Sequence, residues 1–325
     1  MPTGSPLYRR LGCRLRSPSS LRLASSARNR GIFFLRCFCS SNPVPRMNYL
    51  KYERNPTKYW EDFYKRHHDK FFKDRHYLEK DWGRFFCSSS DSEHKSVEPK
   101  MVLEVGCGVG NTLLPLLASF PNVFVHACDF SPHAVALVKE NGAFASDRLN
   151  TFVCDVTKDE LSKTILPSSV DIVTMIFMLS AVSPMNMPAV LQNVRTIIKP
   201  NGYVLFRDYA FGDFAQVKLA NKGQMISENF FVRGDGTVWV LLPSHSMDLS
   251  ICIHFSIINF HKDMMSCFQC AFYFSEDKLS DLFERNGFRT LDMNVYCKEI
   301  VNRSQNVVMD RRWVRATFCC VEQPD

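Results

Sequence analysis

The chain has 325 residues, of which 46% are hydrophobic and 22% are charged, as in ordinary globular proteins. Its net charge of +7 arises in residues 1–46, which hold nine arginines and no acid, leaving 31 of the 40 basic residues against all 33 acidic ones. The excess charge therefore belongs to the N-terminus and says nothing about the ligand of the rest of the chain. Its 13 scattered cysteines exclude a disulfide scaffold, and no apolar run reaches the ~18 residues of a membrane span.

The N-terminal segment, residues 1–46, is rich in arginine and serine, which is the composition of an organellar transit peptide. Its stretch "LRCFCSS", with Arg36, fits a mitochondrial processing site, and a chloroplast address competes with it. A disordered basic tail is the alternative. Because Met47 opens "MNYLKYERNP", a form starting there lacks the address. We expect a mitochondrion or chloroplast if residues 1–46 are used, and cytoplasm or nucleus if translation starts at Met47.

Residues 47–86 are expected to be helical. Residues 51–86 hold eleven aromatic residues and ten Lys or Arg, against seven acids. Five of the side chains fall at helical spacing: Trp60, Phe63, Tyr64, His67 and Phe71. The simplest interpretation is an amphipathic helix that packs on the domain. The sharper one adds a lid over a ligand and a surface for RNA, because aromatic rings stack on bases and cations meet phosphates. Residues 87–100, "CSSSDSEHKSVEPK", predict a polar linker.

From residue 101 onward, strand and helix patterns alternate. "MVLEV", "NVFVHACD", "NTFVCDV", "VDIVTMIFML" and "YVLFRDY" predict strands, and "NTLLPLLASF", "SPHAVALVKENG" and "MPAVLQNVRTIIKPNG" predict helices. Strands separated by helices of this size predict an α/β fold with a parallel sheet covered by helices on both faces. The only CxxC pair, Cys267 with Cys270, has no second pair or histidines at ligand spacing, so no metal is expected.

The first predicted strand runs into a glycine turn, residues 106–110, that reads GxGxG and not the dinucleotide fingerprint GxGxxG. Asp129 ends the second strand 19 residues after Gly110, and Asp155 follows the third. At the carboxyl ends of the strands, the first acid can accept ribose hydroxyls and the second can face an adenine amino group. A nicotinamide cofactor also needs a pyrophosphate cradle, whereas S-adenosyl-L-methionine has no phosphate. "LEVGCGVGN", "ACDFS" and "CDVT" resemble the class I S-adenosylmethionine-dependent methyltransferases; a dinucleotide enzyme is the alternative.

Longer motifs narrow the resemblance. "KYWEDFYKRHHDKFFKDRHYLEKDW", "MIFMLSAVSP", "VLFRDY" and "ENFFVRGDGT" are similar to the tRNA 3-methylcytidine methyltransferases of the methyltransferase-like family, over roughly residues 48–237 and 270–318. This resemblance implies a Rossmann-like doubly wound sheet with an N-terminal helical extension, and methylation of N3 of a cytidine in a tRNA anticodon loop. It implies tRNA as partner and no membrane. Some relatives depend on seryl-tRNA synthetase or another tRNA-bound helper.

The resemblance also implies site residues. The implied cofactor contacts are Trp60, Tyr64, Gly106, Asp129, Asp155 and Ile176. Asp208 is the catalytic candidate, because a carboxylate near the base could accept from its exocyclic amine and stabilise developing positive charge. The alternative is that Asp208 pairs with Arg207 or caps the next turn. Lys73, Arg75 and Arg233 are candidates for tRNA phosphates, with a solvated surface charge as the alternative for each.

Two other functions share the cofactor motifs. One is a methyltransferase of proteins or small molecules, which has no reason to carry "FFKDR" and "RGDGT". The other is a catalytically inactive S-adenosylmethionine-binding subunit. The intact glycine turn, with Asp129 and Asp155, argues against loss of cofactor binding but leaves activity open.

One stretch departs from the family pattern. Val238–Gln269, 32 residues, separates "NFFVRGDGT" from "CAFYFSEDKLSDLF", which the family joins almost directly. The stretch is apolar and has no clear period. A valine codon begins with GT and a glutamine codon can be CAG, which match the ends of an intron. We interpret the insertion as a retained intron or a gene-model error; a partner-binding loop is the alternative.

Overall fold

The computed structural model of the chain describes residues 54–69, 71–87, 98–141, 147–233, 269–303 and 306–322. The expected targeting segment (1–46), most of the expected linker (87–100) and the insertion up to residue 268 lie outside these residues. No helix in the described ranges is long and apolar enough to cross a membrane. Among the same residues, no cluster of three or more His, Cys, Asp or Glu could hold a metal ion.

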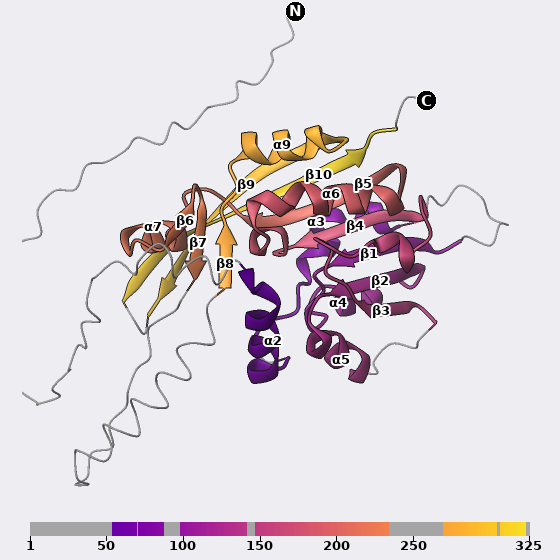
Figure 1. Cartoon of the computed structure of the whole chain (residues 1–325), viewed down its shortest axis with the longest axis horizontal. Helices are drawn as coiled ribbons and strands as arrows, with labels where there is room; N and C mark the ends of the chain where they lie inside the picture. The colour runs from indigo at the N-terminus through magenta and orange to yellow at the C-terminus, as the bar shows by residue number, and fades with distance from the viewer. Residues whose placement is uncertain are drawn as a thin grey trace, which may run out of the picture. The chain divides into compact units, whose positions relative to one another are not determined.

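A seven-stranded sheet forms the centre of the fold, with the order β3-β2-β1-β4-β5-β10-β9 (Figure 1). The strands are β1 Lys100–Val105, β2 Val123–Asp129, β3 Leu149–Val153, β4 Val170–Ile176, β5 Ile198–Tyr209, β9 Phe288–Asn302 and β10 Val307–Cys320. The first five are parallel. Because the chain order reverses between β1 and β4, ligands are expected at the carboxyl ends of these two strands. The sheet confirms the predicted Rossmann-like doubly wound class.

The far edge of the sheet differs from the expected all-parallel arrangement. β10 runs antiparallel to β5, and β9 runs antiparallel to β10. The physical reason is the short connection between β9 and β10, which reverses the chain at once, whereas parallel neighbours need a long crossover.

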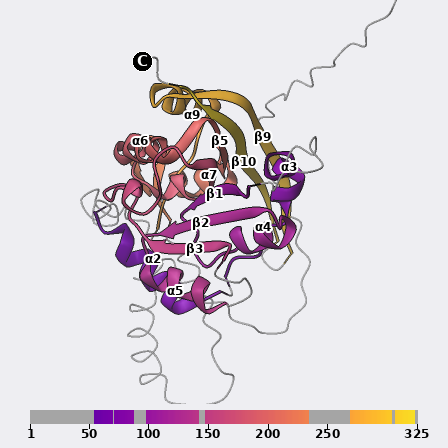
Figure 2. The ribbon, with the colours of Figure 1, turned by 90° about the vertical axis from the view of Figure 1, so that its right-hand side faces the viewer.

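Helices cover both faces of the sheet (Figures 1 and 2). They are α3 Tyr77–Phe86, α4 Leu113–Ser119, α5 Pro132–Glu140, α6 Met187–Ile197 and α9 Glu276–Arg285. On one face, Trp82 and Phe86 of α3 pack with Leu113 and Leu117 of α4 over the centre of the sheet. The other face carries α6 and α9. The two apolar faces of the central strands explain why their sequences read as continuous hydrophobic runs.

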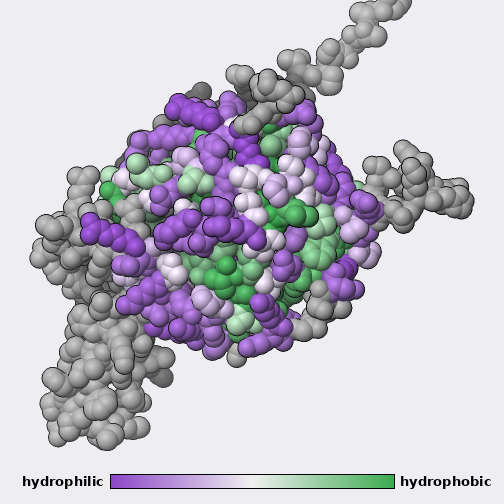
Figure 3. Space-filling view, turned by 45° about the vertical axis from the view of Figure 1, so that its right-hand side comes forward, coloured by the Kyte–Doolittle hydropathy of each residue, from purple (hydrophilic) through white to green (hydrophobic). Residues whose placement is uncertain are grey.

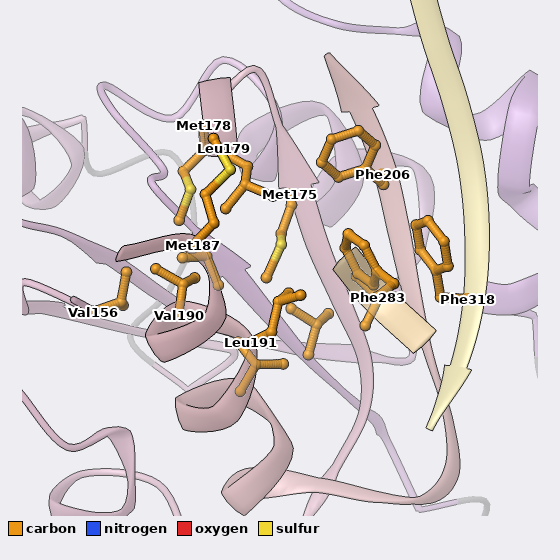
Figure 4. Close-up of a cluster of buried hydrophobic side chains, with 14 of the residues drawn as sticks. Val156, Met175, Met178, Leu179, Met187, Val190, Leu191, Phe206, Phe283 and Phe318 are labelled. Carbon is orange, nitrogen blue, oxygen red and sulfur yellow. The ribbon is translucent and has the colours of Figure 1, made fainter. Parts of the chain in front are cut away.

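The core beneath α6 and α9 reaches the functional end of the sheet (Figure 4). Phe283 of α9 stacks on Phe318 of β10 with ring centroids 3.7 Å apart. At the other end of this core, Met175, Met178 and Met187 gather between β4 and α6. Outside, hydrophobic residues form small patches among hydrophilic ones on the face shown in Figure 3. The core thus supports the loop after β4 from below.

Helix α2, Pro56–His67, lies beside α5 and near β8 (Figure 1). Pro56 occupies its first turn, where no backbone hydrogen bond is lost. Phe63 and Tyr64 are buried against Val109 and Ala134. Phe71, expected to continue the same helical face, lies beyond the end of the helix and is 56% exposed. Its ring still packs edge-on against Phe63 at 4.9 Å, because the chain bends back there.

A second, three-stranded sheet and α7 Phe214–Asn221 follow β5. The strands are β6 Met225–Ser227, β7 Phe230–Arg233 and β8 Gln269–Phe272. β7 and β8 pair antiparallel, with Val232 opposite Cys270 and Arg233 opposite Gln269. The strands on either side of the insertion are therefore direct neighbours.

Candidate active site

A cavity of about 290 Å³ lies at the switch point of the large sheet, with α2 as one wall. Five of the six residues expected to contact a cofactor line it: Trp60, Tyr64, Gly106, Asp129 and Asp155. They come from α2, the glycine turn and the ends of β2 and β3. The fold brings them together because the carboxyl ends of parallel strands meet at one edge of the sheet.

The glycine turn needs glycine at two positions for steric reasons. Gly106 has φ +69°, and a Cβ there would lie 2.9 Å from Cβ of Met178. Gly108 has φ +54°, and its Cβ would lie 2.8 Å from the hydroxyl of Tyr64. A side chain would be strained at both positions and would collide with the loop after β4 or with α2. The turn therefore lets backbone, α2 and ligand approach closely.

Asp129 is held rigidly at the end of β2. One carboxylate oxygen accepts from the N–H of Gly108 and the other from the N–H of Ser131, both at 2.9 Å. Its burial raises its pKa to about 6. Each oxygen retains a free lone pair, so the carboxylate can also accept hydroxyl donors of a ligand.

Asp155, after β3, lies in a different environment. Its carboxylate accepts from the N–H and hydroxyl of Thr157 and forms an ion pair with Lys158 at 2.8 Å. Partial burial opposes ionisation, but the bonds from Lys158 and Thr157 outweigh it and lower the pKa. Asp155 is therefore an ionised acceptor at neutral pH.

Glu104, the second-last residue of β1, is a buried acid beside the glycine turn to which the sequence analysis assigned no role. It is 1% exposed, and burial raises its pKa to about 8 despite the nearby Arg75 and a hydrogen bond from Thr112. Its Oε2 has no hydrogen-bond partner among the described residues. An unpartnered buried carboxyl oxygen is costly without a ligand, so its position beneath the turn favours a cationic or donor group there. The signal in the sequence was an acid placed inside an otherwise apolar strand.

Arg75 was expected to contact a tRNA phosphate, but its side chain turns toward the site. Its guanidinium donates to the hydroxyl of Thr112 and the carbonyl of Ile176, both at 3.0 Å. It also lies over the ring of Phe177, 5.3 Å from the centroid. The nearby buried acids, Glu104 among them, attract the guanidinium inward. These contacts do not test whether Arg75 also binds a tRNA phosphate, so that role stays a prediction.

Ile176, the sixth expected cofactor residue, does not line the cavity, so its contact with the cofactor stays a prediction. Its side chain packs in the core beneath α3 and α4, while Phe177 and Met178 line the cavity. Side chains alternate between the two faces of a sheet along a strand, and Ile176, the last residue of β4, points to the face covered by α3 and α4. Phe177 then turns the backbone with φ +56°.

Asp208, the catalytic candidate, is fully buried and is not among the residues that line the cavity. Its carboxylate accepts from the N–H groups of Ser180 and Tyr209, each at 2.9 Å. Burial raises its pKa to about 6. The alternative pairing with Arg207 does not occur, since Arg207 pairs with Asp81 at 2.8 Å. Asp208 instead supports the earlier loop after β4, which carries Phe177 and Met178, and its catalytic role stays a prediction.

The two remaining candidates for tRNA contact lie further out. Lys73 is exposed in the segment between α2 and α3. Arg233, on β7, donates to the hydroxyl of Tyr209 at 2.7 Å and lies over its ring. Both are cations on the α2 and small-sheet side of the molecule, which leaves the tRNA role of each a prediction.

Comparisons with known proteins agree with this site. Residues 103–204 match the family described as a methyltransferase domain. The tRNA N(3)-cytidine methyltransferase METTL6 of Homo sapiens is 35% identical over 268 residues, which cover 82% of this chain and 81% of that protein. The tRNA N(3)-methylcytidine methyltransferase trm141 of Schizosaccharomyces pombe is 32% identical over 270 residues, covering 82% and 94%.

Among solved structures, a SAM-dependent methyltransferase from Anabaena variabilis matches the fold with a TM-score of 0.51 at 12% identity, covering 82% of this chain and 95% of that one. This likeness shows the class I methyltransferase fold. The match to the curated relatives covers 82% of the chain, which is more than the matched methyltransferase domain at residues 103–204. The chain belongs to the tRNA N(3)-cytidine methyltransferase family.

Proposed function

We propose that this protein transfers the methyl group of S-adenosyl-L-methionine to N3 of a cytidine in the anticodon loop of tRNA. The observation that carries the proposal is the cavity beneath α2, in which Trp60 and Tyr64 of the family's N-terminal motif face Asp129 and the glycine turn. The curated relatives carry the same activity in their names.

The residues present fit the cofactor. Asp129 is held so that it can accept from both ribose hydroxyls, and Asp155 remains ionised to accept from an adenine amino group. No donor cluster for a diphosphate is required by this cofactor, in agreement with the GxGxG turn.

The methyl transfer requires little proton transfer by the protein. N3 of neutral cytidine has a lone pair and no proton, so it needs no general base, and the cofactor supplies an electrophilic methyl group. The chain's residues exclude water, hold the base flipped out of its stack and align N3 with the methyl group. The product base is cationic, so the negative charge of Asp208, beneath the loop after β4, stabilises it.

The proposed tRNA surface includes Lys73 and Arg233, with Arg75 at its inner edge. A tRNA-bound helper such as seryl-tRNA synthetase belongs to the same proposal as a tRNA-specific requirement. Assays with and without purified synthetase test it: a rate that is equal with both preparations on every tRNA rejects the helper.

The decisive experiment incubates the purified protein with labelled S-adenosyl-L-methionine and total tRNA, followed by nucleoside mass spectrometry. We expect 3-methylcytidine in the product. Methyl transfer to protein or a small molecule instead, without 3-methylcytidine, supports the first alternative. Cofactor binding without any transfer, in the presence of the synthetase, supports an inactive subunit.

A further inference from the structure

The side chain of Glu61 connects helix α2 to the cofactor half of the molecule through polar contacts. The carboxylate of Glu61 accepts from the hydroxyl of Ser131 and from the N–H of His133 at 3.2 Å. These two donors form the start of α5, so the carboxylate also lies at the positive end of that helix. Lys65 pairs with Glu61 from the solvent side at 3.2 Å.

The same contact leads directly to the cofactor residue. Ser131 donates its N–H to Asp129, and Asp129 accepts from Gly108 through its other oxygen. Gly108 in turn lies against the hydroxyl of Tyr64, which belongs to α2. A closed path therefore runs from Glu61 on α2 through the β2–α5 turn and the glycine turn back to α2.

The apolar contacts of α2 do not by themselves select one position of the helix. Phe63 and Tyr64 pack on Val109 and Ala134, and the ring of Trp60 stacks on Tyr64 with centroids 5.7 Å apart. Hydrophobic contact is non-directional, whereas a carboxylate with two donors fixes both distance and orientation. Trp60 and Tyr64 form a wall of the cavity, so the position of α2 decides whether the cavity is closed.

We propose that Glu61 is a positioning residue that locks α2 over the bound cofactor, and that release of the cofactor requires this lock to open. Ser131 donates its hydroxyl to Glu61 and its N–H to Asp129, the expected acceptor of the ribose hydroxyls. This shared donor couples closure of α2 to cofactor binding. The inference rests on the cofactor part of the proposed function and is independent of the tRNA substrate.

The test compares four variants without tRNA: Glu61→Ala, Glu61→Gln, Ser131→Ala and the double variant of Glu61→Ala with Ser131→Ala. Asp62→Ala, which removes the next acid on the same helix, is the matched control. Affinity for S-adenosyl-L-methionine is measured by calorimetry, and its release by stopped-flow competition with labelled cofactor. We expect Glu61→Ala to weaken affinity about tenfold, or about 1.4 kcal/mol, mainly through faster release.

Three further results separate positioning from general stability. Glu61→Gln should lose less affinity, because its amide oxygen can still accept one bond. The double variant should be no weaker than the weaker single variant, since both remove one contact. With tRNA, KM for the cofactor should rise while kcat at saturating cofactor stays near the parent value.

Unchanged cofactor release in Glu61→Ala overturns the proposal, as does an equal loss in Asp62→Ala. A fall in melting temperature and kcat with an unchanged KM for the cofactor assigns Glu61 a structural role only. If Glu61→Ala does not fold, Glu61→Gln and Ser131→Ala decide by the same release rates. Failure of tRNA methylation in the parent protein leaves these binding results intact and therefore distinguishes the two proposals.

Discussion

Oδ2 of Asp129 accepts a hydrogen bond from the N–H of Gly108 at 2.9 Å, which joins the end of β2 to the glycine turn after β1. This bond fixes the carboxylate of Asp129, the expected acceptor of the ligand's hydroxyls, relative to the glycine turn. This relationship makes the first prediction specific.

Asp129→Ala should weaken binding of S-adenosyl-L-methionine by about 100-fold or more, because the loss of a charged acceptor for buried hydroxyls costs on the order of 3 kcal/mol. Calorimetry measures the affinity, and circular dichroism checks that the fold is retained. An affinity close to that of the parent protein would show that the ribose site lies elsewhere.

Asp208→Asn should lower the methyl-transfer rate about tenfold, and more than it weakens tRNA binding, because the carboxylate acts on charge that develops during transfer. Since the pKa of Asp208 lies near 6, the parent rate should fall as the pH drops below about 6, and the variant should lack this dependence. Single-turnover rates across pH measure both effects. Asp281→Asn, at an exposed ion pair, serves as control. Equal rates in the parent and the variant would reduce Asp208 to a cap of the Ser180 loop.

Glu104→Gln should change how stability of the cofactor-free protein depends on pH. The folded pKa of Glu104 is about 8, above the ordinary value of 4.5, so the folded protein binds the proton more tightly than the unfolded chain. The contribution of Glu104 to stability is therefore fully present below pH 4.5 and falls between about pH 4.5 and 8, by about 1.4 kcal/mol per pH unit. Urea unfolding of both proteins should show their difference shifting in favour of the variant across this window. A difference that does not vary with pH contradicts the shifted pKa.

Deletion of residues 238–269 should leave the fold and the cofactor affinity intact and improve solubility. Val232 pairs with Cys270 and Arg233 with Gln269, so deletion would place Thr237 opposite Arg233. Gly234, Asp235 and Gly236 would then form a three-residue hairpin loop, a common length for which glycine is suited. Thermal melting and tRNA methylation of the two forms measure the effect. We propose on the same ground that the segment is a retained intron or a gene-model error. Transcripts that mostly contain the segment, together with equal activity of the longer protein, would overturn this.

Residues 1–46 fused to a fluorescent reporter should direct it to mitochondria or chloroplasts, because an arginine-rich, acid-free leader is what their import machinery accepts. Microscopy with organelle markers measures the distribution. Replacing the nine arginines by glutamine is the matched control and should abolish import. A diffuse cytosolic and nuclear signal from the unaltered fusion would support use of the start at Met47.

The sequence by itself determined the alternation of strands and helices, the glycine turn and the positions of Asp129 and Asp155. These features are local, since each acid directly follows an apolar strand and the turn is contiguous. Chain continuity and the parallel-sheet rule then bring them to one edge. The sequence also identified residues 238–269 as an insertion between two stretches that the family joins almost directly, and the structure pairs the strands on either side.

Only the tertiary structure decided how the longer side chains are used. Arg75 reaches Ile176, 101 residues away, and Glu61 reaches Ser131, 70 residues away. Asp208 lies beneath the loop after β4 and is not among the residues that line the cavity. A lysine, arginine or acid has the same local pattern whether it meets solvent, RNA or a buried partner. The choice depends on desolvation and on charges contributed by distant segments, which exist only once the chain is folded.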